Sequence, residues 1–207
     1  MLDDLGALAG LIGHAFSLWW IMIPAIVVGR GTAVIASNPL HRALTTNFSD
    51  LPAERRFYAY WLFADPSARA VPLDWVSSAR ETVGVLRASV TRFPQDQRLH
   101  DLVDELSTLS LEFRSLLDEH DFEEPSSGAK RYRHPVAGEL TLLHEVAQLS
   151  DEHWLHLYWG EKGSESEGAL DRLRAASAAA PPPAQIGAVS SMIVPMLSVM
   201  NAMRRPI

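Results

Sequence analysis

The histidines are the residues of this sequence with the widest chemical use, because imidazole can act as an acid, a base or a metal ligand near neutral pH. There are eight of them, spread along the chain. His100, His120 and His144 stand as separate acid–base candidates. His153 and His156 are three residues apart in a segment with strand-like alternation, where their side chains face opposite ways. That spacing does not favour a shared metal ion.

Other catalytic patterns are absent from the sequence. It has no H-E-x-x-H zinc motif, no G-x-S-x-G nucleophile elbow, no Walker loop and no G-x-G-x-x-G phosphate loop. It also has no cysteine, which excludes thiolate metal sites, disulfides and cysteine nucleophiles. We therefore expect no metal and no cofactor; haem binding by a histidine has no support from spacing. Whether the protein is an enzyme stays open.

Composition and charge narrow the class of protein further. The 207 residues are 47% hydrophobic and 21% charged, which suits one globular domain with an appendage. The formal net charge is −7, and the basic residues cluster only at AKRYRH (129–134) and at Arg204-Arg205. Because nucleic-acid-binding domains neutralise phosphates with clustered lysine and arginine, we expect no direct DNA binding. A bacterial cytoplasmic protein is the expectation.

The first 29 residues raise the question of a membrane span, because no charged side chain occurs from Leu5 to Gly29. The second half of this stretch argues against one, since AIVV-GRG-TAVIAS has the pattern of a β-hairpin at residues 24–37, with Arg30 on its turn. Asp3 and Asp4 do not suit a signal peptide. We predict a helix at residues 2–20 and no stable membrane span, while membrane association of residues 5–23 stays open.

A block of helices is predicted next. Asn38-Pro39 marks the start of a short helix at residues 39–46, and a second is predicted within LPAERRFYAYWLFADP (51–66). The segment DWVSSARETVGVLRASVTRF (74–93) spaces its apolar residues by three and four, as does QRLHDLVDELSTLSLEFRSLLDEHD (97–121). A break at residues 107–111 is expected to divide the latter into two helices.

Strand-like patterns follow the helical block. KRYRHP, ELTLLHEVAQL and HWLHLYWG are separated by turn residues, and in the last of these Trp154, His156 and Tyr158 alternate with Leu155, Leu157 and Trp159. A final helix is predicted in SESEGALDRLRAA (164–176). Hairpin, helices and three strands together predict an α+β fold, an antiparallel sheet with a large helical insert.

The C-terminal residues 175–207 are predicted to be an appendage. AASAAAPPPAQ has the composition of a stiff linker. The four methionines after it share one helical face, which indicates packing on the protein's own core or an adaptable surface for partners, a membrane or a lid.

The order of these segments resembles the ligand-binding domain of the MmyB-like transcription regulators, in which an Xre-type helix-turn-helix precedes a PAS-like sensory domain. The resemblance covers residues from about 24 to about 173. Its most specific segment is GAKRYRHPVAGELTL (128–142). The others are PAIVVGRGTAVIASNPLHRAL, ERRFYAYWLFADPSAR, DWVSSARETVGVLRA and ELSTLSLEFRSLLDEH. We expect an N-terminal apolar helix (1–23), an MmyB-like, PAS-like ligand-binding domain (24–174) and the C-terminal appendage (175–207).

The resemblance implies an apolar cavity between sheet and helical insert, with a long-chain fatty acid as one plausible occupant. The aromatic residues of the predicted helices independently suit a small-molecule pocket. The candidate ligand-binding residues are Asn38, Arg56, Phe57, Tyr58, Trp61, Arg87, Phe113, His120 and His134. Lys130 is a further candidate for a ligand's carboxylate or carbonyl.

Each polar candidate also has a structural interpretation. Asn38 is placed to cap a helix, and the two arginines lie on helices where solvation or ion pairing is usual. His120 follows two acidic residues at a helix end, which suits a dipole interaction. His134 precedes a proline and could anchor its strand by a backbone hydrogen bond. Lys130 follows a loop and is expected to be exposed.

The sequence also departs from the family pattern. No helix-turn-helix precedes residue 24, Phe57 stands where an asparagine is common, and Leu117 stands where a tryptophan is common. Three function classes follow: a sensor that binds a fatty-acid- or polyketide-like metabolite, a cofactor-independent enzyme such as a cyclase of secondary metabolism, and the sensory half of a longer regulator. If catalysis occurs, Asn38, Arg56, His134 and an aromatic side chain are the candidates. A homodimer is left open.

Overall fold

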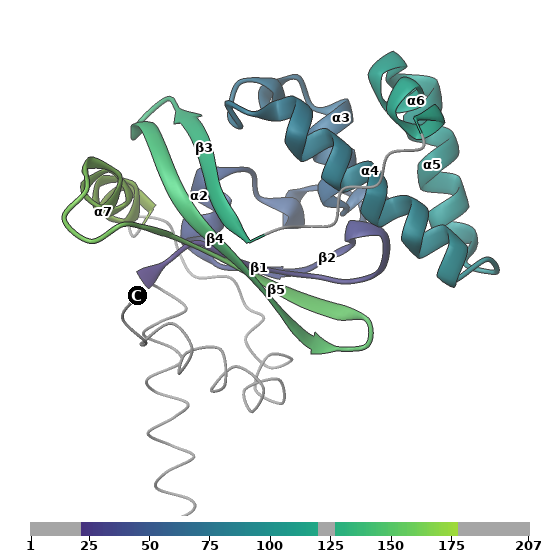
Figure 1. Ribbon diagram of the computed structural model, residues 1–207, viewed down its shortest axis with the longest axis horizontal. Coiled ribbons are helices and arrows are strands. Elements are labelled where there is room, and N and C mark those ends of the chain that lie inside the picture. The colour runs from purple at the N-terminus through teal and green to yellow at the C-terminus, as the bar shows by residue number, and fades with distance from the viewer. Residues whose placement is uncertain (1–21, 120–126, 178–207) are drawn as a thin grey trace, which may run out of the picture.

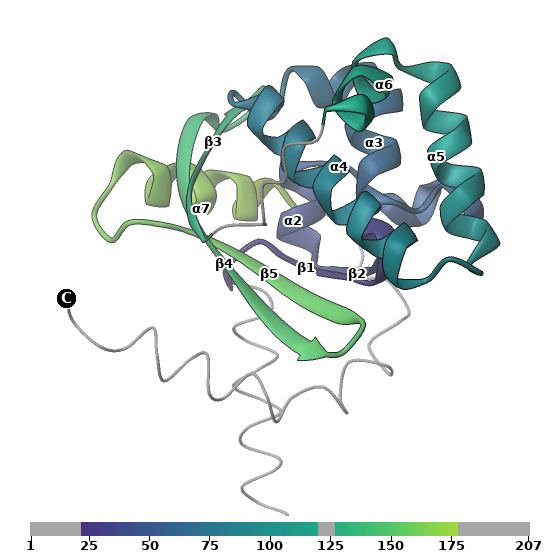
Figure 2. The same cartoon turned by 45° about the vertical axis from the view of Figure 1, so that its right-hand side comes forward.

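The computed structural model describes residues 22–119 and 127–177, which form an α+β fold (Figure 1). Within this described part, five antiparallel strands make one sheet in the order β2-β1-β5-β4-β3. Helices α3 to α6 lie over one face of that sheet in both views (Figures 1 and 2). The predicted α+β class, with an antiparallel sheet interrupted by a helical insert, is confirmed.

The elements follow one another as hairpin, helical block, three strands and a last helix. The strands are β1 (Ala25–Val28), β2 (Val34–Ser37), β3 (Gly128–His134), β4 (Gly138–Ser150) and β5 (His153–Gly160). The helices are α2 (Pro39–Leu44), α3 (Tyr58–Ala64), α4 (Trp75–Arg92), α5 (Gln97–Leu109), α6 (Leu111–Asp118) and α7 (Glu165–Ser177). Short 3₁₀ helices occupy Arg30–Thr32, Phe48–Asp50, Ala53–Arg55 and Pro66–Arg69.

The turn between β1 and β2 depends on a glycine. Gly31 has φ +55°, in the left-handed region that side chains disfavour. A Cβ atom at this position would lie 2.2 Å from Cδ2 of Leu99 on α5. The glycine therefore lets the hairpin turn approach the helical insert closely, and Arg30 lies on the turn as predicted.

Helix α2 begins at the cap that its sequence indicates. The side chain of Asn38 accepts a hydrogen bond from the backbone N–H of His41 at 2.7 Å, and Pro39 occupies the first helical position. The same Asn38 oxygen accepts from the backbone N–H of Ala25, so it also fixes the start of β1. This fully buried side chain ties the hairpin to the first helix.

Helix α3 begins later than its sequence indicates. The predicted helix within residues 51–66 is divided into the 3₁₀ turn Ala53–Arg55 and α3, which starts at Tyr58. Phe57 between them is extended and bridges to Ala33, while the backbone N–H of Val34 donates to the carbonyl of Arg56. Pairing with the hairpin therefore overrides helix propensity here.

The two faces of the sheet carry separate apolar clusters. Ile26 and Leu142 belong to the main core, which the helical block covers. The alternate positions Val27 and Leu155 belong to a second cluster. The last helix, α7, contributes Leu170 to the main core and packs against β4, β5 and α2.

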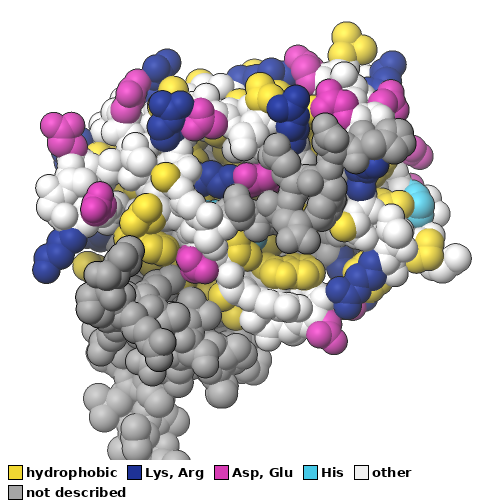
Figure 3. Space-filling model, in the orientation of Figure 1, with side chains coloured by type: hydrophobic (Ala, Val, Ile, Leu, Met, Phe, Trp, Pro, Cys, Tyr) yellow, Lys and Arg dark blue, Asp and Glu magenta, His cyan; other side chains and the backbone are white. Residues whose placement is uncertain are grey.

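Charged side chains of both signs share the face of the molecule drawn in Figure 3. Arg131 pairs with Asp74, and Arg69 pairs with Glu112. Among the described residues, no helix is long and apolar enough to cross a membrane. Nearly all of the predicted N-terminal helix and of the methionine-bearing appendage lies outside the described residues.

Candidate functional site

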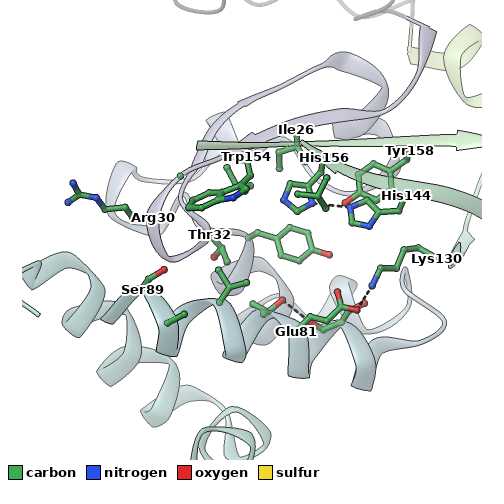
Figure 4. Close-up of a pocket in the computed structure, with 18 of the residues that line it drawn as sticks. Ile26, Arg30, Thr32, Glu81, Ser89, Lys130, His144, Trp154, His156 and Tyr158 are labelled. Carbon is green, nitrogen blue, oxygen red and sulfur yellow. Dashed lines mark hydrogen bonds and ion pairs between the residues drawn. The ribbon is translucent and has the colours of Figure 1, made fainter. Parts of the chain in front are cut away.

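A pocket of about 370 Å³ lies between the sheet and helix α4 (Figure 4). One wall comes from β1, β3, β4 and β5, and the facing wall comes from α4. The rest of the lining comes from Tyr58 at the start of α3, from Gly29, Arg30 and Thr32 at the hairpin turn, and from Phe93 directly after α4. We call this cavity the sheet–α4 pocket.

Helix α4 divides its residues between the core and the pocket. Its large apolar side chains, such as Val83 and Leu86, are buried in the main core. A neighbouring stripe of small and polar side chains faces the pocket at spacings of three and four: Ser78, Glu81, Thr82, Val85, Ala88, Ser89 and Arg92. Small side chains on this stripe leave the volume that the pocket occupies.

Strand alternation builds the opposite wall. On β5, Trp154, His156 and Tyr158 face the pocket, whereas Leu155 and Leu157 belong to the second cluster. The alternation predicted for this segment is therefore confirmed. Antiparallel pairing sets His156 opposite Val146 on β4 and Ile26 on β1, and both of these apolar residues also line the pocket.

Five aromatic polar side chains gather on this wall and at its edge. We call them the polar cluster: Tyr58, Tyr132, His144, His156 and Tyr158. Nε2 of His144 and Nδ1 of His156 are 2.9 Å apart in a hydrogen bond. The His144 ring also stacks on Tyr158, with ring centroids 4.6 Å apart. His144 on β4 lies directly opposite Tyr158 and diagonally opposite His156 on β5, and side chains in both relations are within reach across an antiparallel pair.

Burial keeps four members of the polar cluster, Tyr58, Tyr132, His156 and Tyr158, uncharged near neutral pH. It lowers the pKa of His156 to about 3, with a further contribution from nearby His144. Burial likewise raises the pKa of Tyr58, Tyr132 and Tyr158, and the charge of Glu81 adds to each of these shifts. These four side chains therefore offer neutral hydrogen-bond donors and acceptors near neutral pH.

Three charged residues of the lining, Arg30, Glu81 and Lys130, form ion pairs. Nζ of Lys130 lies 2.5 Å from a carboxylate oxygen of Glu81, and both side chains are largely buried. Figure 4 shows this pair across from the histidines, joining β3 to α4. At the other end, Arg30 pairs with Glu152 and, at 3.4 Å, with Asp96. The guanidinium of Arg30 also lies over the ring of Phe93.

Of the sequence-predicted binding set, Tyr58 lines the sheet–α4 pocket. The further candidate Lys130 lines it too, and its side chain is largely buried against Glu81 rather than exposed as expected. Phe57, Trp61 and Phe113 are buried in the main core. Asn38 is the buried helix cap described above. His120 lies outside the described residues.

Two arginines and one histidine of the predicted binding set form hydrogen bonds with backbone groups away from the pocket. Arg56 is exposed, and its guanidinium donates to the carbonyls of Leu51 and Ser49. Arg87 donates to the carbonyl of Glu119. His134 donates from Nε2 to the carbonyl of Ala43 at 2.8 Å, while its Nδ1 accepts from two backbone N–H groups of the β3–β4 turn. These contacts hold loops and strand ends in place.

Most of the pocket's polar residues were not singled out as ligand-binding candidates from the sequence. His144 and His156 are separated by a turn, and only strand register brings them together. Glu81 and Lys130 are 49 positions apart. One signal was present: small and polar residues recur at helical spacing within α4, beside its apolar stripe.

Metal binding has no support in the described part of the chain, where no group of three or more histidine, cysteine, aspartate or glutamate side chains is placed to hold an ion. The hydrogen-bonded histidine pair uses one nitrogen of each ring for the other. What the arrangement can do is hold a mainly apolar molecule and hydrogen-bond to it.

In the comparison with protein-family models, the MmyB-like transcription regulator ligand binding domain matches residues 20–173. The matched region contains all five strands of the described sheet and every residue that lines the sheet–α4 pocket. In the comparison with curated proteins, no sequence matches this chain. The chain therefore belongs to the family of MmyB-like transcription regulator ligand-binding domains.

Proposed function

We propose that the protein binds a small hydrophobic metabolite, fatty-acid- or polyketide-like, in the sheet–α4 pocket. The observation that carries this proposal is the pocket itself. Its volume of about 370 Å³ falls within the range of roughly 300–1,000 Å³ that is usual for small-molecule sites.

The character of the lining supports a mainly apolar ligand. Ile26, Val28, Val85, Val146 and Trp154 supply apolar surface on both walls. Apolar atoms make up most of the pocket surface, although hydroxyl and charged side chains also line it, on α4 and beside the polar cluster. A mainly apolar surface with placed polar groups is typical of sites that bind by burial and orient the ligand by hydrogen bonds.

The same groups favour binding over acid–base catalysis. A general acid or base works best when its pKa lies near the working pH. The pKa of His156 is lowered to about 3, and burial raises the pKa of Tyr158. Both groups are therefore weak catalysts of proton transfer at neutral pH, although both remain good hydrogen-bonding partners. A sensory role in the cytoplasm is part of this proposal.

A pocket-filling substitution tests the proposal. Val85→Trp places an indole into the cavity from the middle of α4, and Val76→Trp places one on the exposed surface of the same helix. N-phenyl-1-naphthylamine, a neutral apolar probe that fluoresces in apolar surroundings, reports occupancy. We expect saturable binding by the wild type and by Val76→Trp, and loss of binding by Val85→Trp. Equal binding by all three proteins would refute a site in this pocket.

A further inference from the structure

Two polar groups in the sheet–α4 pocket, the hydroxyl of Tyr58 and Nε2 of His156, can each make a hydrogen bond to a ligand. The hydroxyl of Tyr58 makes no hydrogen bond to another described residue. His156 uses Nδ1 for its bond to His144, and its Nε2 makes no hydrogen bond within residues 22–119 and 127–177. Solvent can reach both atoms, because neither is among the side-chain nitrogen and oxygen atoms that are fully buried and lack a hydrogen-bond partner. Both residues line the pocket, so a ligand that fills it meets both.

A ligand that displaces solvent from these groups must replace the hydrogen bonds that solvent makes. A pure hydrocarbon cannot do so, and it would leave the hydroxyl and the imidazole nitrogen without partners. An oxygen on the ligand can satisfy them. The tautomer of the histidine pair decides whether Nε2 of His156 donates or accepts, and a ligand hydroxyl suits either case.

The charges around the pocket decide which kind of oxygen fits. Lys130 is already held by Glu81, and Arg30 is held by Glu152 and Asp96. Both charges of the Glu81–Lys130 pair act on the pocket: beside the larger effect of burial, Glu81 adds to the raised pKa of Tyr58, and Lys130 adds to the lowered pKa of His156. Because these two charges offset each other, a ligand carboxylate in the interior would lose its hydration without gaining a cation that is not already paired.

We propose that the ligand presents an uncharged oxygen, a hydroxyl or a ketone carbonyl, to Tyr58 and His156 in the interior of the sheet–α4 pocket. The ligand class is thus a neutral oxygenated hydrophobic molecule rather than an ionised fatty acid. This inference rests on the proposed function and narrows it. Arg92, an exposed cation of the lining on the last turn of α4, marks the place where a carboxylate could bind instead.

Matched ten-carbon probes separate the two classes of ligand. 1-Decanol and decanoate have the same chain length, and at pH 8 decanoate is ionised. Each is titrated against the fluorescent naphthylamine probe bound to the whole chain. We expect 1-decanol to displace the probe at a concentration at least about tenfold lower than decanoate does.

Substitutions locate the contact. Tyr58→Phe removes one hydroxyl at constant shape and is expected to weaken 1-decanol about three- to tenfold, the range of one neutral hydrogen bond. It should leave decanoate unchanged. Tyr60→Phe is the matched control, because Tyr60 lies on the same helix and does not line the pocket. Arg92→Ala is expected to leave 1-decanol binding unchanged.

Tighter binding of decanoate than of 1-decanol would overturn the inference, as would a Tyr58→Phe variant that binds 1-decanol as the wild type does. If the wild type binds decanoate more tightly than 1-decanol and Arg92→Ala loses decanoate binding, the result would point to a carboxylate at the pocket edge. The proposed function would then stand. If the naphthylamine probe does not bind and neither compound displaces it, the proposed function itself is refuted.

Discussion

His41 provides a quantitative prediction about acid stability. Its side chain is 1% exposed in the main core beside Tyr158, with ring centroids 5.8 Å apart. Burial, with smaller contributions from Arg42 and His144, lowers the pKa of His41 to about 3. In the unfolded chain the pKa returns to about 6.5. Below pH 6.5 the unfolded state therefore binds a proton that the folded state does not accept.

The sign and size of the effect follow from proton linkage. Because the unfolded state binds more protons between pH 6.5 and about 3, stability falls as the pH falls through this window. One and a half pH units at about 1.4 kcal/mol each give a loss of about 2 kcal/mol by pH 5 from His41 alone. The lowered pKa values of His156 and His134 act in the same direction.

Urea unfolding at pH 7 and pH 5 measures this loss. His41→Phe keeps an aromatic ring and removes the titrating group, so its loss between the two pH values should be about 2 kcal/mol smaller than that of the wild type. Leu44→Ala, at another buried position of α2, is the control. It should lower stability equally at both pH values. Equal pH-dependent losses in His41→Phe and the wild type would refute the reasoning.

Three further predictions concern stability and are measured by the same unfolding experiment. Leu86→Ala removes a fully buried side chain and should cost about 2–5 kcal/mol; a much smaller loss would mean that the core collapses around the site. Lys130→Met leaves the carboxylate of Glu81 without its partner and should cost about 1.5–3 kcal/mol. Adding Glu81→Gln should restore most of this stability, and additive losses from the two substitutions would contradict coupling between the residues. Gly160→Ala would place a Cβ atom 2.5 Å from the backbone nitrogen of Glu167 and should cost about 1–3 kcal/mol, so an unchanged midpoint would contradict the close packing of α7 on β5.

The fold was predictable where local patterns and tertiary structure agree. The alternation in HWLHLYWG indicates which side chains of β5 share a face, and the structure confirms it. Asn38-Pro39 marks the start of α2, and the three-to-four spacing marks α4. Local pattern failed at residues 53–57, where pairing of Phe57 with Ala33 replaces the first turns of the expected helix.

The pocket was less predictable, because its polar groups meet through tertiary contacts. His144 and His156 become partners through the register of β4 and β5, and Lys130 meets Glu81 across the space between sheet and helix. Neither contact can be inferred from the local sequence. The aromatic residues were a weaker guide than expected, since size and apolar character suit core positions as well as pocket walls: Trp61 is buried in the core, whereas Tyr58 lines the pocket.

The most direct test of the central claim is a titration of the methyl-labelled protein with 1-decanol, followed by NMR. Binding in the sheet–α4 pocket should shift the methyl signals of Ile26, Val85 and Val146, which come from both walls. The methyl signals of Leu155 and Leu157, in the second cluster on the other face of the sheet, should change little. Shifts confined to that other face, or no shifts at saturating 1-decanol, would contradict the account.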